Sequence, residues 1–167
     1  DCTSTGDDYI YFDSTNNVLY VNGQIEIDGS LELTGKANDK TIYYTGRGAI
    51  LAHGDITLDT HLLTCNNGNP ADYNNSYPEN CLGFMTYQNM SMGSNAQLDL
   101  MGAFYAEGTI KSTKQTVVMG TFVANYFDMG SQVPDIYQVP ELAKNLPFGM
   151  IGNWPLWTFA QVSWRER

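Results

Sequence analysis

The stretch that decides the fold is LMGAFYA, from Leu100 to Ala106, because VMGTFVA follows it eighteen positions later, at Val118–Ala124. A related copy, GAILA at Gly48–Ala52, starts three such periods before Gly102. Small and apolar residues recur at every second position of these copies, which is the period of a β-strand. The repeat therefore predicts the coils of a parallel β-solenoid, in which equivalent residues stack about 4.8 Å apart.

From this repeat we predict an all-β fold, a right-handed parallel β-solenoid of about five rungs. Residues 1–17 are polar with scattered aromatics and predict an extended lead-in. Regular alternation over residues 18–133 predicts the solenoid body. Residues 134–167 contain repeated prolines and several aromatic residues, and they predict a C-terminal aromatic capping segment.

The repeat also predicts which side chains share a column. One inward column should contain Ile50, Phe104 and Phe122. Phe84 joins it if the less regular stretch after residue 81 forms a rung offset by twenty residues instead of eighteen. The alternative is an ordinary β-sandwich whose strands resemble one another in sequence.

Charge and hydropathy exclude some partners. The chain has 8 Lys and Arg against 18 Asp and Glu, a net charge of −10, which is the wrong sign for a surface that neutralises phosphates. Nucleic acid is therefore not an expected partner. No run approaches the roughly 20 apolar residues of a membrane-spanning helix, so membrane contact is expected only through a segment outside this sequence.

A polar, Asn-rich insert lies between Cys65 and Cys81. We predict a disulfide between these cysteines, worth about 3 kcal/mol by loop closure. Such bonds persist in oxidising compartments, so the pair favours an exported protein. Asn69, Asp72 and Glu79 make the insert a weak calcium candidate, but it lacks a recognised calcium-loop pattern, and a solvated loop is the simpler interpretation. No other metal and no cofactor is expected.

One outward column is apolar where water-facing side chains are expected. It contains Leu51, Met85, Tyr105 and Val123. Such a stripe is either covered by the chain itself or marks an interface with a neighbouring subunit. The candidates for cover are the C-terminal aromatics Phe148, Trp154, Trp157 and Phe159.

Two tyrosines of the insert, Tyr73 and Tyr77, are further candidates for contact with a partner protein or a glycan, because exposed tyrosine is well suited to recognition. The alternative is that one of them packs the insert against the body.

The sequence does not predict an enzyme. The outward column through His53 would place Glu107 about two strand spacings away, roughly 10 Å, which is too far for a direct acid–base pair. No stack of carboxylates of the kind used by β-helical polysaccharide lyases and hydrolases forms.

Several motifs resemble the β-solenoid domain of PilX-type pilus-assembly proteins, the accessory or minor pilins (ComZ-like) of bacterial type IV pili. These motifs are GAILAHGDI at Gly48–Ile56, the copies at Gly102–Ala106 and Gly120–Ala124, and the closing VSWRE at Val162–Glu166. The resemblance covers residues 18–166. It implies an N-terminal apolar helix, which this sequence lacks, and no catalytic residues.

The expected function is therefore that of a structural or adhesive surface protein, an accessory or minor pilin-like component of a type IV pilus or related extracellular filament. Other pilin or filament subunits are the expected partners, and surface glycans are a further candidate. One alternative is a secreted carbohydrate-binding or carbohydrate-active β-helix protein. Another is a polymer-forming intracellular solenoid resembling bactofilins, for which reduced cysteines would be expected.

Overall fold

The computed structural model describes residues 2–3, 8–35, 41–73, 76–93, 97–147 and 150. Thirteen strands and one short 3₁₀ helix form this part of the chain. They are β1 (Cys2–Thr3), β2 (Tyr9–Asp13), β3 (Val18–Ile27), β4 (Leu31–Thr34), β5 (Thr41–Ala52), β6 (Ile56–Asp59), β7 (His61–Asn66), β8 (Asn69–Tyr73), β9 (Cys81–Thr86), β10 (Met90–Met92), β11 (Asp99–Ser112), β12 (Val117–Asp128), β13 (Asp135–Gln138) and η1 (Pro140–Lys144).

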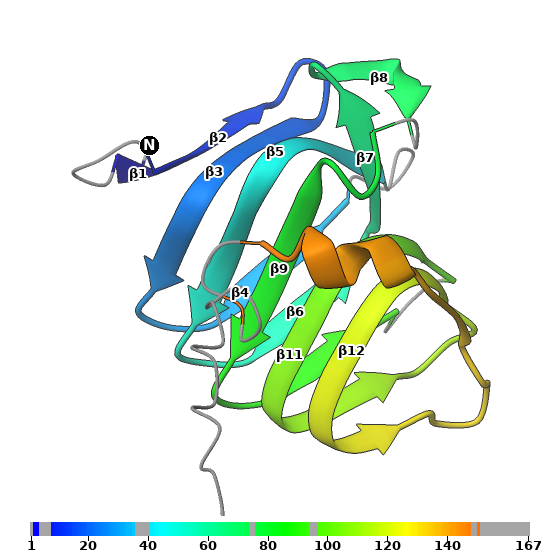
Figure 1. The fold of residues 1–167 in the computed structure, drawn as a ribbon. Coiled ribbons are helices and arrows are strands. Elements are labelled where there is room, and N and C mark those ends of the chain that lie inside the picture. The colour runs from blue at the N-terminus through cyan, green and yellow to red at the C-terminus, as the bar shows by residue number, and fades with distance from the viewer. Residues whose placement is uncertain are drawn as a thin grey trace, which may run out of the picture.

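Most strands stack in parallel ladders (Figure 1). In the first ladder β3 pairs with β5, β5 with both β7 and β9, β9 with β11, β11 with β12, and β12 with β13, all in parallel. In the second ladder β4, β6, β10 and the end of β11 pair in parallel. The all-β class is confirmed. A β-sandwich does not fit, because the two sheets of a sandwich are antiparallel, whereas the strands of these ladders are parallel.

The predicted inward column is present. Ile50 is the register partner of Phe84, Phe84 of Phe104, and Phe104 of Phe122. The rings of Phe84 and Phe104 are nearly parallel, with centroids 5.9 Å apart, and those of Phe104 and Phe122 lie 5.1 Å apart. Phe84 joins the column with the offset of twenty residues, because the turn before β11 is longer than the turn before β12.

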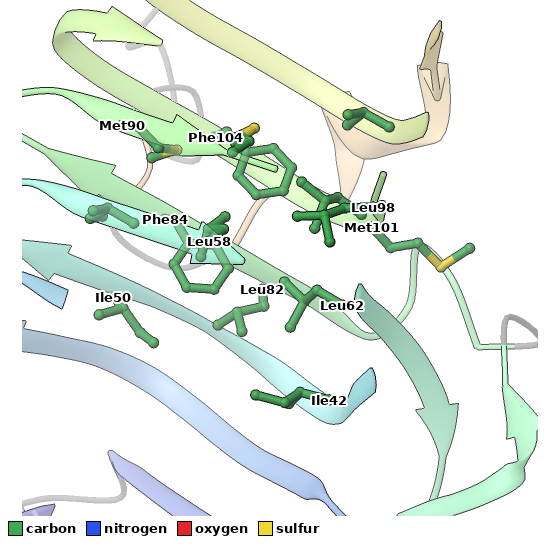
Figure 2. Close-up of a cluster of buried hydrophobic side chains, with 14 of the residues drawn as sticks. Ile42, Ile50, Leu58, Leu62, Leu82, Phe84, Met90, Leu98, Met101 and Phe104 are labelled. Atoms are coloured by element: carbon green, nitrogen blue, oxygen red, sulfur yellow. The ribbon is translucent and has the colours of Figure 1, made fainter. Parts of the chain in front are cut away.

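The core lies between the two ladders (Figure 2). Side chains of the first ladder such as Ile50, Phe84 and Leu62 face those of the second, such as Leu58 and Met90. All five are at most 1% exposed. Alternate residues of every strand therefore fill one continuous apolar interior, as period-two patterning requires.

The two ends of the chain depart from the parallel pattern. The lead-in is not merely extended: β2 pairs antiparallel with β3, and β1 antiparallel with β2. At the other end β13 adds one short parallel strand, and η1 follows, with Pro140 as its first residue. The predicted aromatic cap lies mostly outside the described residues. No helix of the described chain is long and apolar enough to span a membrane.

The stacked phenylalanines make a testable contribution to stability. Replacing the fully buried Phe104 by alanine (Phe104→Ala) should lower the free energy of unfolding by about 3–5 kcal/mol, because the cavity interrupts the column between Phe84 and Phe122. Glu107→Ala on the same strand, at an exposed position, is the control and should change it by about 0.5 kcal/mol or less. Urea unfolding of both variants measures the difference. Equal losses would contradict the stacked core.

Candidate interaction surface

The predicted outward column is formed in register. Leu51 is the partner of Met85, Met85 of Tyr105, and Tyr105 of Val123. These four side chains therefore lie side by side across β5, β9, β11 and β12, on the face opposite the phenylalanine column.

Part of this column is covered by the segment that follows β13. Val139, Leu142, Leu146 and Met150 pack with Met85, and Leu51 and Tyr105 join the same cluster. Figure 1 shows η1 lying across β9 and β11. The Arg47 guanidinium donates a hydrogen bond to the Leu146 carbonyl at 3.2 Å, which fixes the segment to β5.

The cover explains a glycine on β9. A Cβ at Gly83 would lie 2.6 Å from the sulfur of Met150, so any larger residue here would require the Met150 side chain to move. The predicted cover by C-terminal aromatic residues stays a prediction. Aliphatic side chains of residues 139–150 cover the column in the described chain, whereas Phe148, Trp154, Trp157 and Phe159 lie outside it.

The cover does not reach Val123, which is 52% exposed. Val123 belongs to a group of exposed apolar residues that we call the β12–β13 patch. Its members are Val123, Tyr126, Met129, Val133, Ile136 and Tyr137. The sequence analysis found only the first of them, because alternation identifies outward positions but does not tell which strand is the last of a stack.

The insert interrupts a strand without disturbing its neighbours. Tyr44 of β5 pairs with Thr64 at the end of β7, and Arg47 pairs with Cys81 at the start of β9. The two strands thus lie end to end along the same side of β5, and the chain leaves and re-enters the ladder between them.

The side chain of Asn80 fills the gap between β7 and β9. Its Oδ1 accepts the Gly46 N–H at 3.1 Å, and its Nδ2 donates to the Cys65 carbonyl at 3.0 Å and to Thr45 Oγ1 at 3.3 Å. The amide replaces the backbone groups that an uninterrupted strand would supply opposite Gly46. Sequence reasoning missed this residue, since one asparagine in an Asn-rich insert carries no distinguishing signal.

The structure differs from the predicted disulfide, because Cys65 and Cys81 are both free thiols, and both are buried. The Asn80 side chain joins the two ends of the insert by hydrogen bonds where a covalent bond was expected. Burial raises the pKa of the Cys65 thiol. It also raises the pKa of Cys81 to about 12, against the opposing effect of the nearby Arg47 charge.

The structure describes the side chain of only one of the two insert tyrosines. Tyr77 is partly buried, and its hydroxyl donates to the Met119 carbonyl at 3.0 Å, so it packs the insert against β12. Burial also raises the pKa of Tyr77 well above its ordinary value. The backbone of Tyr73 pairs with Cys65 at the end of β8, while its side chain lies outside the described part of the structure.

Two of the weak calcium candidates, Asn69 and Asp72, make hydrogen bonds within the insert. Asp72 accepts a hydrogen bond from Asn66 Nδ2 at 3.1 Å, and Asn69 Oδ1 accepts the Ala71 N–H at 3.1 Å. Both side chains therefore stabilise the β7–β8 hairpin. Within the described ranges, no group of three or more His, Cys, Asp or Glu side chains could hold a metal ion.

Two histidines lie beside carboxylates. His53 Nε2 is 2.5 Å from a Glu26 oxygen, and its ring meets the edge of Tyr87 with centroids 5.4 Å apart. His61 Nδ1 accepts the Asp99 N–H at 3.0 Å. The first histidine follows the end of β5, while the second pairs with its beginning, so the two pairs lie at opposite ends of the strand.

The bridging role of Asn80 can be tested. Asn80→Ala should lower the free energy of unfolding by about 1–3 kcal/mol, because it leaves the partly buried N–H of Gly46 and carbonyl of Cys65 without these partners. Asn66→Ala, which removes an exposed hydrogen bond within the insert, is the matched control and should cost about 0.5 kcal/mol or less. Chemical denaturation separates them. A loss of stability in Asn80→Ala no larger than that in Asn66→Ala would show that water replaces the Asn80 side chain, and it would contradict the bridging role.

The buried thiols predict a loss of stability in alkali. The pKa of Cys81 is about 12 in the folded protein against an ordinary value of 9.0, so its contribution is complete below pH 9 and is lost as the pH rises towards 12. The free energy of unfolding should therefore fall as the pH rises from about 9 towards 12, and fall less steeply for Cys81→Ala. Parallel slopes for the two proteins in urea unfolding at a series of pH values would contradict this origin.

Comparisons of the chain with known protein families, with curated proteins and with solved structures find no match.

Proposed function

We propose that this chain is a non-enzymatic structural or adhesive module of an extracellular bacterial filament, in the manner of an accessory or minor pilin. In this proposal the body is a right-handed parallel β-solenoid of about five rungs. The motifs that resemble PilX-type proteins motivate the assignment to a surface filament. The observation that carries it is the β12–β13 patch.

The strand pairings support the solenoid interpretation. Gly23, Gly48, Leu82, Gly102 and Gly120 occupy one equivalent position on successive strands of the first ladder. The second ladder repeats the order β4, β6, β10 and β11. Long parallel ladders of this kind make a stiff body, because neighbouring coils share both backbone hydrogen bonds and packed columns.

The patch supports a role in assembly. Six large apolar side chains are exposed on β12, β13 and the turn between them, and their exposed fractions run from 44% to 65%. Monomeric proteins rarely leave extended apolar surface in water, and such surface marks contact with another protein. A subunit of a larger structure needs this kind of surface.

The arrangement of titratable groups favours a non-enzymatic role. The two histidine–carboxylate pairs are far apart along β5, and the Glu26 carboxylate of the first pair is itself exposed. In the described chain neither histidine is grouped with two carboxylates, as an acid–base arrangement for glycoside chemistry would require.

A hollow of about 230 Å³ with both polar and apolar lining favours glycan binding as a second candidate function. It lies over the second ladder and is lined by Asp55, Ile56, Thr57, Asn89, Met90, Ser91, Thr109 and Lys111. Tyr126, which is exposed, is the register partner of Thr109 and so lies beside the hollow. Hydroxyl, amide and carboxylate groups next to an exposed aromatic ring suit the hydroxyls and apolar face of a sugar.

The filament proposal is tested on the source cells. Surface filaments are sheared from the cells, and mass spectrometry is used to detect this chain and determine its native N-terminus. We expect the wild-type chain in the filament fraction. We expect a Val123→Lys/Ile136→Lys variant, which places two charges in the patch, to be depleted from that fraction at least about tenfold while it stays folded.

Glu107→Lys, an exposed charge change outside the patch, is the control and should leave the filament fraction unchanged. Finding the wild-type chain only as a soluble secreted protein would contradict the filament proposal. In that case the hollow beside Tyr126 directs the next experiment to a panel of immobilised oligosaccharides.

A further inference from the structure

We propose that the outer edge of β12 is the contact between two copies of this chain, which pair their β12 strands antiparallel about a two-fold axis near Ala124 and Asn125. This inference rests on the proposed use of the β12–β13 patch in assembly, and it names a second copy of the chain as the partner that binds there.

The edge is long and open in the described chain. β13 pairs with Val117–Gly120 of β12, and no described strand pairs with Thr121–Asp128 on that side. In the described chain these eight residues of backbone have no strand on that side, and they run from the first ladder, at Thr121–Ala124, into the second, at Tyr126–Asp128. Natural sheets rarely leave an edge of this length and low charge uncovered, because it recruits other strands.

The core is incomplete at the same edge. Phe84 and Phe104 are fully buried, whereas Phe122, the last member of the column, is only partly buried. Phe127 is also partly buried and packs against Phe122, with ring centroids 5.7 Å apart. A further strand beside Thr121–Asp128 would cover both rings.

Stacking of one copy on the opposite end of another is blocked. At that end β2 pairs with Val18–Asn22 of β3. With Gly23 equivalent to Gly120, Val18–Asn22 correspond to residues 115–119, which overlap the Val117–Gly120 stretch that pairs with β13. If β3 of one copy stacked directly on β12 of another, β2 of the first and β13 of the second would both have to occupy the single strand position between them.

The edge is complementary to itself. In an antiparallel pair centred between Ala124 and Asn125, Phe122 of one copy lies opposite Phe127 of the other, and both face the interior. Val123 then lies opposite Tyr126, and both face outward. Every large apolar residue of the edge gains an apolar partner at cross-strand distance, about 5 Å.

Charge favours the same pairing. Asp128 is the single ionisable carboxylate of Thr121–Asp128, and it would lie opposite Thr121 of the other copy, so two carboxylates do not meet. The opposite end of the molecule has Glu26, Asp28 and Glu32 on β3, β4 and the turn between them. The Thr121–Asp128 edge thus has fewer carboxylates than the opposite end.

Sedimentation and cross-linking of the full-length purified chain test the inference. We expect a discrete dimer at micromolar concentration, whose dissociation constant rises more than about tenfold in Val123→Lys. In a Cys2→Ser background, the Thr121→Cys/Asp128→Cys variant should give a covalent dimer under mild oxidation, linked between position 121 of one copy and position 128 of the other. Neither single variant should give this link.

A Thr121→Cys/Gln24→Cys variant tests for head-to-tail stacking. Only that arrangement would bring position 121 of one copy beside position 24 of another and link the two by a disulfide. Cross-linking of that variant, oligomers that grow without limit, or a monomer at all concentrations would each overturn the inference. A monomer whose β12 amides resist hydrogen exchange would show that the chain covers its own edge. Detection of the chain in sheared filaments is independent of these results, so the proposed function can stand when the dimer fails.

Discussion

The structure depends on the parallel register of four strands, β5, β9, β11 and β12, because this register brings Ile50, Phe84, Phe104 and Phe122 into one column. A slip of one residue between any two of these strands would turn every phenylalanine outward and every polar neighbour inward. Both the buried column and the apolar outward column follow from the same register. The covered face and the exposed patch are therefore two results of a single constraint.

The sequence predicted the parts of the fold that repeat. Glycine, apolar and alanine positions recur often enough for Phe104 and Phe122 to be aligned by inspection, and Phe84 followed once a longer turn was allowed. The antiparallel pairing of β2 could not be predicted, because Tyr9, Tyr11 and Phe12 belong to no repeat. A chain end pairs according to the edge it meets, and that edge exists only after the rest has folded.

The site was less predictable than the fold. The outward column was placed correctly, and Leu142 and Met150 cover part of it, whereas the predicted aromatic cover lies outside the described residues and stays a prediction. The disulfide prediction rested on spacing alone, and Asn80 performs the joining function instead. With both thiols free and buried, the cysteines no longer argue for an oxidising compartment. The extracellular assignment now rests on the resemblance to pilus proteins.

The interruption at Asn80 has a consequence for how this protein can vary. β7 lies twenty residues after its partner positions on β5, and β9 lies thirty-four after its own, yet both strands are in the ladder and the later strands keep their spacing. The loop between β7 and β9 can therefore change in length without shifting the strands that form the core. Related sequences are free to differ there in the size and chemistry of the loop, and a foreign peptide grafted into it with Tyr77 and Asn80 retained would be displayed on the same scaffold.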